Sequence, residues 1–573
     1  MRHFRKASAL LAGFVMFACA PTELAEHRRV EGVRYLDQGI STDERQRLYH
    51  YSQGTRIMNY EWFMALEQSN NREPFASPQN LARFGFLPSE RSDHNPNGLP
   101  VGFAKDVDSE TGDAFVGFTC AACHTGQINT GTIGVRIDGG ASLVDTDQFL
   151  TSLFRSLAIT RLLPTKFNRF ADKVLGDDHS EAERASLRED VDSVIDRVKD
   201  QQNINRDLGL YPVAEGPGRT DALGRGGNLV FGTGISPANY RKADAPVRFP
   251  SLWDIWSYDW VQYNASIHQP MARNVAEALG VRALVTLKIP PGGTEDDLYA
   301  STVRLAEIDR MERILQKLKP PPWPEEILGR IDREKWRQGK ALYEARCAGC
   351  HDPAWREVDR FGNLGRRMIT VPLDKIGTDD KAATNFAERT VDTGDLGLGT
   401  VSAARALEVV TTKVIERKYD ELGIPEAERV RMNGCRENEW RAPLAYKAKP
   451  LDGVWASPPY LHNGSVPNMY QLLLPAEERD KVFHVGTYRY DPVHMGYETG
   501  PFEDSFRFDT TLPGNSNAGH EFRDGSGEGV IGPPLSDAER FALIEFLKAP
   551  ETNREPPPRQ AGDAADCIVP AGG

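Results

Sequence analysis

Two cysteine motifs carry the most specific chemistry in this sequence. Residues 120–124 read C-A-A-C-H, and residues 347–351 read C-A-G-C-H. Two cysteines three positions apart lie on one side of a helical turn, where each thiol can bond a vinyl group of one haem while the next histidine faces the iron. The spacing therefore predicts two covalently bound haem c groups with their iron. Their cofactor-binding and metal-ligating residues would be Cys120, Cys123, His124, Cys347, Cys350 and His351.

Zinc and dithiol chemistry are the alternatives for the same cysteines. The two pairs together could form a four-cysteine zinc site, but zinc would not require a histidine after each pair. A thioredoxin-like dithiol would favour a strand–helix–strand context, which neither motif has. We therefore expect a metal-binding, haem-containing electron-transfer protein.

The overall composition restricts the class of protein. The chain has 573 residues, and its 82 acidic residues outnumber the 69 basic ones, so the formal net charge is −13. A nucleic-acid binder needs a basic surplus, so we expect no nucleic-acid partner. The 51 glycines and 38 prolines show no period and predict long irregular loops rather than a fibrous repeat.

The first residues resemble an export signal. Arg2, Arg5 and Lys6 precede a short apolar stretch that ends at Ala18, which predicts a signal peptide over residues 1–19. Cys19 stands where lipoproteins carry their lipidated cysteine, so plain secretion and a lipid anchor both remain open. Either alternative predicts a periplasmic or secreted protein.

Two further cysteines are left after the haem motifs and Cys19. In an oxidising compartment Cys435 and Cys567 could form a disulfide. The alternative is that they are two buried thiols.

Helix signals bracket the second motif. Residues 334–346 predict a helix that runs into C-A-G-C-H, and Ser536 followed by acidic residues predicts a closing helix that stops before Pro550. The proline-rich stretch 320–324 marks a boundary before the first of these helices. We expect a mainly α protein with two cytochrome c-type haem domains, at 40–325 (with loop insertions) and 332–550, and an extended tail at 551–573.

In its motifs and predicted helices the chain resembles a known protein superfamily. The segment 451–465, which contains P-P-Y-L-H-N-G-S, is similar to the signature of the bacterial dihaem cytochrome c peroxidase and MauG superfamily, and the closing helix matches as well. The loops 218–224 and 259–264 look most like its RoxA-like, rubber oxygenase-type branch. The resemblance covers nearly all of the chain after residue 40.

The resemblance suggests how the irons are completed. His520 stands near the place where the peroxidases carry a distal methionine, so it is the expected second ligand of the C-terminal haem, with His462 as the competitor. A histidine ligand agrees with the bis-histidine haem of RoxA-like proteins. For the N-terminal haem no distal ligand stands out, so its iron is expected to be open.

The resemblance also points to residues around the open haem. The peroxidase glutamate is missing from the corresponding stretch 269–274, which leaves Asn274 and the nearby Glu277 as candidate distal groups. Trp260, with Tyr263 second, is the candidate for an aromatic that passes electrons between the haems; the alternative is that both are packing residues. Arg136, Arg219 and Arg248 are candidates for pairing with haem propionates.

Three functions follow as hypotheses. The first is an oxidoreductase that activates O2 at the N-terminal haem and acts on an apolar substrate. The second is a peroxidase that reduces H2O2 with electrons from a small donor protein. The third is an electron carrier without catalysis.

Overall fold

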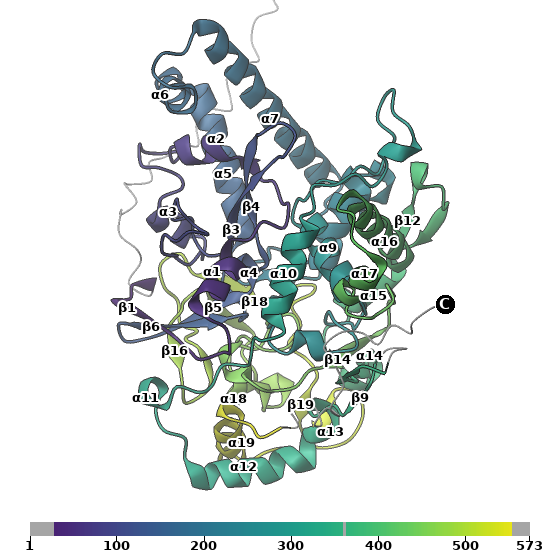
Figure 1. Ribbon diagram of the computed structural model, residues 1–573. Helices are drawn as coiled ribbons and strands as arrows, with labels where there is room; N and C mark the ends of the chain where they lie inside the picture. Colours follow the sequence, from purple (N-terminus) through teal and green to yellow (C-terminus); the bar gives the residue numbers. More distant parts are fainter. Residues whose placement is uncertain (1–27, 359–361, 553–573) are drawn as a thin grey trace, which may run out of the picture.

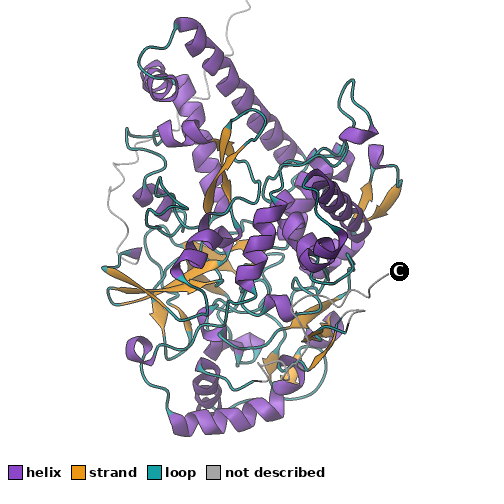
Figure 2. Ribbon diagram, in the orientation of Figure 1, coloured by secondary structure: helices purple, strands orange, loops and turns teal. Residues whose placement is uncertain are grey.

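The computed structural model describes residues 28–358 and 362–552 of the chain and has a mixed α/β structure. Helices account for 40% of the residues and strands for 16%, and the strands are distributed over many small sheets (Figure 2). The expectation of a mainly α protein was therefore wrong. The strands are two to six residues long, too short to produce the alternation by which strands are recognised in a sequence.

Two of the sheets are three-stranded. They have the orders β1–β6–β5 and β2–β4–β3, with bounds Gly32–Tyr35, Ile133–Asp138, Thr125–Thr130, Met58–Asn59, Ala114–Phe118 and Phe103–Val107. The other sheets are strand pairs: β7–β8 (Arg219–Thr220, Val247–Arg248), β9–β10 (Trp355–Glu357, Leu364–Arg366), β11–β14 (Ile369–Pro372, Ala445–Ala448), β12–β13 (Thr390–Asp392, Thr400–Ser402), β15–β18 (Val482–Val485, Phe506–Asp509), β16–β17 (Tyr490–Asp491, Gly496–Tyr497) and β19–β20 (Glu521–Phe522, Val530–Gly532).

The helices of the first half include a projecting group, α5–α7, at the top of Figure 1. The helices are α1 (Thr42–His50), α2 (Tyr60–Ala65), α3 (Pro78–Ala82), α4 (Cys120–Cys123), α5 (Thr146–Leu162), α6 (Pro164–Leu175), α7 (Glu181–Asp207), α8 (Ala222–Gly227), α9 (Pro270–Gly280) and α10 (Leu305–Leu315). The projecting helices share a phenylalanine-rich core with α2 and the β3–β4 hairpin. Within the described residues no helix combines the length and the apolar character that crossing a membrane requires.

The second half begins with a long helix that ends at the second haem motif. Its helices are α11 (Glu325–Leu328), α12 (Arg333–Arg346), α13 (Ala348–His351), α14 (Leu373–Ile376), α15 (Lys381–Glu388), α16 (Ala403–Glu421), α17 (Glu426–Met432), α18 (Met469–Leu472) and α19 (Asp537–Lys548). The structure confirms the two helices that the sequence predicted around the motif, as α12 and α19. Ser536 caps α19 through the backbone N–H of Glu539, as its sequence suggested.

Helices α12 and α19 cross at the bottom of the molecule (Figure 1). A glycine makes the close approach possible, because a Cβ on Gly339 of α12 would lie 1.9 Å from the carbonyl oxygen of Ala542 in α19. Beside the crossing, the ring of Phe546 lies 4.9 Å from Tyr343 and 5.4 Å from Trp336, measured between ring centres. This crossing holds the end of α12, and with it the second motif, against the C-terminal helix.

The two halves share one hydrophobic core. A single cluster of buried side chains extends from Ile40 to Leu547 and takes members from both sides of the proline-rich stretch. The structure therefore does not show two cytochrome c domains, as the sequence had suggested, because the apolar surfaces of the halves are buried against each other. The boundaries near residues 325, 332 and 550 stay predictions.

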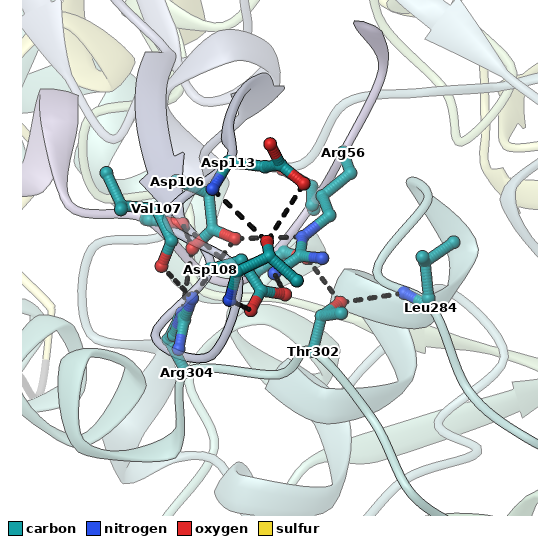
Figure 3. A network of polar contacts seen from close by, with 12 residues as sticks. Arg56, Asp106, Val107, Asp108, Asp113, Leu284, Thr302 and Arg304 are labelled. Atoms are coloured by element: carbon teal, nitrogen blue, oxygen red, sulfur yellow. Dashed lines mark hydrogen bonds and ion pairs between the residues drawn. The ribbon is translucent and has the colours of Figure 1, made fainter. Parts of the chain in front are cut away.

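A buried ion-pair network attaches the β3–β4 hairpin to the segment before α10 (Figure 3). The carboxylate of Asp106 accepts hydrogen bonds from Arg56 at 3.0 Å and from Arg304 at 2.7 Å. Thr302 adds a hydrogen bond to the carbonyl of Gly54 at 2.7 Å. Because Asp106 is 2% exposed, loss of either arginine would leave a poorly solvated charge. The network fixes the hairpin whose second strand leads into the first haem motif.

We predict that Gly339→Ala destabilises the protein by about 1–3 kcal/mol, because the added methyl group meets the backbone of α19. The measurement is urea-induced unfolding followed by circular dichroism. Gly226→Ala is the matched control, since the nearest atom to its Cβ would be 3.6 Å away in ordinary contact. Equal unfolding midpoints for the two variants would contradict the close crossing.

Candidate functional site

The first haem motif forms one helical turn that follows strand β4. Thr119 caps α4 by accepting a hydrogen bond from the backbone N–H of Ala121 at 3.2 Å, and the N–H of His124 bonds the carbonyl of Cys120 at 3.0 Å. Gly102, at φ +87°, allows the turn to pack closely, because a Cβ there would lie 2.2 Å from Cα of Ala122. The motif therefore forms the single helical turn expected of a c-type haem attachment motif.

The second motif repeats this turn at the end of α12. The N–H of His351 bonds the carbonyl of Cys347 at 2.9 Å, and the N–H of Cys347 bonds the carbonyl of Tyr343 at 2.8 Å. Among the described residues, no group of three or more His, Cys, Asp or Glu could hold a metal ion. The four motif cysteines are all free thiols and do not converge on a four-cysteine site.

Each motif histidine is oriented by a backbone carbonyl. The Nδ1–H of His124 donates to the carbonyl of Pro250 at 2.7 Å, and the Nδ1–H of His351 donates to the carbonyl of Lys449 at 2.7 Å. A donating Nδ1 leaves Nε2 as the free ligand nitrogen, which is the usual arrangement of a metal-bound histidine. Burial lowers the pKa of His124 to about 4, although the ring keeps some accessible surface.

A second histidine faces the second motif. The ring centres of His351 and His520 are 6.1 Å apart. Two imidazoles bound to opposite sides of one metal, each through a bond of about 2.0 Å, place their ring centres about 6 Å apart. The Nδ1 of His520 is buried and has no hydrogen-bond partner. The residues present therefore fit a haem with two histidine ligands at this motif.

The first motif has a different environment. The ring of His124 contacts Phe249, at 6.3 Å between centres, and no second histidine ring faces it within the described part of the chain. Helix α9 lies close to the motif, since Glu277 acts electrostatically on both Cys120 and Cys123. The two motifs therefore differ in their surroundings.

Arg479 holds the loop that presents His520. Arg479 is 2% exposed, and its guanidinium donates to the carbonyls of Asn517, Gly519 and His520, the last two at 2.9 Å. It also donates to three carbonyls of the segment 471–474. His520 itself has φ 43°, a conformation that non-glycine residues adopt only where surrounding contacts enforce it. Sequence analysis missed Arg479, and no local motif marks it.

The two orienting carbonyls belong to a structural repeat. We call residues 247–269 the first repeat and residues 446–468 the second repeat. In each, a residue with positive φ (Asp254 or Gly453) precedes a 3-10 turn, Ile255–Ser257 or Val454–Ala456. In each, an isolated antiparallel bridge then encloses a tight loop, Val261↔Ile267 or Tyr460↔Val466. Matching positions of the two repeats are a constant number of residues apart, and by this spacing Pro250 corresponds to Lys449.

The repeats pack directly against each other through matching residues. The indole N–H of Trp253 donates to the carbonyl of Asp452, its counterpart, at 2.9 Å. The rings of Tyr263 and His462, also counterparts, are 6.1 Å apart in an edge-to-face contact. Contacts between equivalent residues are those expected around an approximate two-fold axis. The ammonium of Lys449 also donates to the hydroxyl of Ser251, which links the two segments that orient the motif histidines.

The aromatic candidates occupy different places. Trp260 is partly exposed and packs on His268, at 5.1 Å between ring centres, with the guanidinium of Arg441 3.8 Å from its ring centre. Tyr263 lies between the repeats against His462, which in turn stacks on Tyr446 at 4.1 Å. The structure thus brings Tyr263, rather than Trp260, to the contact between the repeats. His462 therefore packs against these tyrosines and is not part of the His351–His520 pair.

The two candidate residues on helix α9, Asn274 and Glu277, have different partners. The side chain of Asn274 is engaged by Glu312, to which it donates at 3.0 Å, and by Arg273, from which it accepts at 3.0 Å. Glu277 accepts a hydrogen bond from Gln262 at 3.3 Å, and burial raises its pKa. Glu277 is therefore the α9 side chain that could act as an acid or base near the first motif, whereas Asn274 supports the buried Arg273–Glu312 ion pair.

Two lysines beside the orienting segments were not found by sequence analysis. Lys447 and Lys449 are half-buried, and burial lowers the pKa of Lys447 to about 7. Neither forms an ion pair with any described carboxylate. Their ammonium groups lie over the rings of Tyr258 and Trp253, and haem propionates would supply an anionic partner. Arg219, proposed for that role from sequence, is instead occupied by Glu215, Asn463 and Asn515.

The remaining cysteine prediction is answered in part. Cys435 is disulfide-bonded. Cys567, its expected partner, and Cys19, with the predicted export signal, lie outside the described residues.

Comparison with known proteins agrees with this geometry. The chain is 41% identical over 594 residues to the uncharacterized protein y4iJ of Sinorhizobium fredii (strain NBRC 101917 / NGR234), and the alignment covers 94% of this chain and 98% of y4iJ. The chain belongs to the y4iJ family. It is also 26% identical over 315 residues to the uncharacterized protein y4iM of the same organism, which covers 52% of this chain and 63% of y4iM.

A family model adds a chemical description. Residues 445–484 match the model described as RoxA-like, cytochrome c-like. This match contains the second repeat and supports a c-type haem and a cytochrome function. The RoxA-like part of the resemblance is thereby supported, whereas the wider peroxidase and MauG superfamily stays a prediction.

We predict that Arg479→Met loosens the His520 loop, because each buried carbonyl left without a donor costs about 1–3 kcal/mol. Hydrogen–deuterium exchange should increase over residues 514–522, and the free energy of unfolding should fall by about 3 kcal/mol or more. Arg523→Met is the control, since the side chain of Arg523 is 42% exposed and pairs with Glu521, and ion pairs near the surface contribute little. Unchanged exchange in Arg479→Met would show that the guanidinium does not hold the loop.

Proposed function

We propose that this protein is an exported oxidoreductase with two covalent haem c groups of unequal role. The haem at Cys347 and Cys350 would be bound by His351 and His520 and would transfer electrons. The haem at Cys120 and Cys123 would be bound by His124 and left open. A bound haem supplies one-electron chemistry and, at an open position, a site for O2 or peroxide. The observation that carries the proposal is the 6.1 Å pairing of His351 with His520, which has no counterpart at His124 among the described residues.

Residues around the two motifs would have different roles. The carbonyls of Pro250 and Lys449 hold the motif histidines in one orientation. Lys447 and Lys449 stand where they could neutralise propionates. Tyr263, in contact with His462, offers an aromatic route between the repeats, and its position favours it over Trp260. The protein would exchange electrons with a small redox protein or act on an apolar substrate.

Haem content and ligation test this proposal. A pyridine haemochrome assay should find two haems per chain, and the reduced protein should bind CO at one of them. His520→Ala should convert the low-spin haem to a high-spin form, because one of its two histidine ligands is removed. The matched control is His462→Ala, which should leave the low-spin spectrum in place. Two six-coordinate haems that do not bind CO would instead indicate a non-catalytic electron carrier.

One observation favours a second candidate function, reduction of H2O2. Glu277 is a partly buried carboxyl group close enough to the first motif to act electrostatically on both of its cysteines, and burial raises its pKa. Such a group can hold and deliver a proton during cleavage of an O–O bond. The side chain of Gln262 fixes one of its oxygens.

The two candidates differ in their dependence on Glu277. If the protein is a peroxidase, Glu277→Gln should lower kcat for H2O2 reduction by about 10²–10⁴-fold, while Glu307→Gln, on the neighbouring helix α10, should leave it unchanged. Turnover is measured with a reduced cytochrome c as donor. If both variants retain wild-type H2O2 turnover, or if only O2 is consumed, the peroxidase function is excluded.

A further inference from the structure

The two repeats are joined by reciprocal hydrogen bonds of their backbones. The N–H of Arg248 in the first repeat donates to the carbonyl of His462 in the second, at 2.9 Å. The N–H of Lys447 in the second repeat donates to the carbonyl of Tyr263 in the first, at 2.7 Å. These four residues are two pairs of counterparts, so each contact is the image of the other. The segments that orient the two motif histidines are therefore held against each other.

The contact between Lys449 and Ser251 has no such image. The ammonium of Lys449 donates to the hydroxyl of Ser251, and the ring of Trp253, whose centre lies 5.5 Å away, attracts the same ammonium. The reciprocal contact would join the counterparts of these residues, Pro250 and Pro450, and a proline side chain has no hydrogen-bonding group. The link therefore runs in one direction only, from a side chain of the second repeat to the backbone segment of the first.

The two ends of Lys449 contact different parts of the site. Its carbonyl accepts the Nδ1–H of His351 at 2.7 Å. Its ammonium holds Ser251, and the peptide bond before Ser251 contains the Pro250 carbonyl, which accepts the Nδ1–H of His124 at 2.7 Å. One residue thus reaches from the segment that orients the second motif histidine to the segment that orients the first.

The backbone that carries the Pro250 carbonyl is anchored on both sides. The N–H groups of Phe249 and Leu252 donate to carbonyls of other segments, at 3.0 and 2.8 Å. Between these anchors Pro250 has no N–H group to donate, and the hydroxyl of Ser251 bonds the ammonium of Lys449. Loss of that contact would leave the Pro250 carbonyl free to shift between the two anchors.

We propose that the side chain of Lys449 positions His124, the histidine of the other motif, and thereby sets the strength of its bond to the first haem iron. A hydrogen bond from Nδ1 makes the opposite ring nitrogen a stronger ligand, and this effect depends on where the accepting carbonyl lies. Lys449 fixes that place through Ser251, so a residue of the second repeat tunes the first motif. The inference rests on the proposed function, in which His124 is the single protein ligand of the open haem.

Resonance Raman spectra of the reduced holoprotein test the proposal, because they contain the iron–histidine stretching band of a five-coordinate haem. Lys449→Met should shift this band to lower wavenumber, since the hydrogen bond from Nδ1 weakens when the accepting carbonyl is no longer held. Ser251→Ala should give the same shift without a change of charge. The double variant should shift the band no further than either single variant, because both remove one contact. Lys449→Arg, which can still donate to Ser251, should restore the wild-type band.

Lys447→Met is the matched control. It removes the same charge two residues away, where the ammonium lies 5.2 Å from the ring centre of Tyr258 and not at Ser251, so the band should stay in place. An unchanged band in Lys449→Met or in Ser251→Ala would overturn the proposal. An equal shift in Lys447→Met would also overturn it, because the effect would then be one of charge.

Hydrogen–deuterium exchange separates this inference from the proposed function. In the holoprotein the N–H of Leu252 bonds the carbonyl of Gly139 at 2.8 Å. Its exchange should be faster in Lys449→Met and Ser251→Ala than in Lys447→Met, whatever the ligands of either iron. A wild type without an iron–histidine band would contradict only the open haem of the proposed function, and this exchange comparison would then decide the inference. Equal exchange in the three variants would overturn it.

Discussion

The arrangement of the whole site depends on hydrogen bonds from two histidine side chains to two backbone carbonyls. A hydrogen bond from Nδ1 fixes the orientation of a histidine ring and leaves Nε2 free to hold a metal, and the carbonyls of Pro250 and Lys449 accept such bonds. These carbonyls lie at matching positions of two repeats that contact each other through Trp253 and Asp452. The two motifs are therefore not placed independently. Any movement of one orienting segment is resisted by the other, which agrees with a core shared by both halves.

On this shared framework the two motifs have become different. The second is closed by a loop that presents His520 and is held by the buried guanidinium of Arg479. The first has helix α9 with Glu277 nearby. The two motifs thus have unequal surroundings on one framework, which agrees with the unequal roles proposed for them.

Sequence analysis succeeded where the signal was local. Both C-x-x-C-H turns, the helix 334–346 and the capped closing helix were predicted because a few adjacent residues specify each of them. It failed on the fold class, because strands of two to six residues have almost no detectable periodicity. The repeats also escaped notice, since they are related mainly by backbone conformation. Their shared residues, such as Asn264 and Asn463 or Trp256 and Trp455, are few and far apart in the chain.

By itself the sequence predicted which atoms would attach a haem, because covalent attachment requires fixed residue types at a fixed short spacing. It also indicated His520, and the structure brings that ring opposite His351. Only the tertiary structure decided that Tyr263 rather than Trp260 lies between the repeats, that Arg479 holds the His520 loop, and that the ammonium of Lys449 reaches Ser251. These outcomes depend on contacts between segments up to hundreds of residues apart, and such contacts are set by packing in three dimensions rather than by neighbours along the chain.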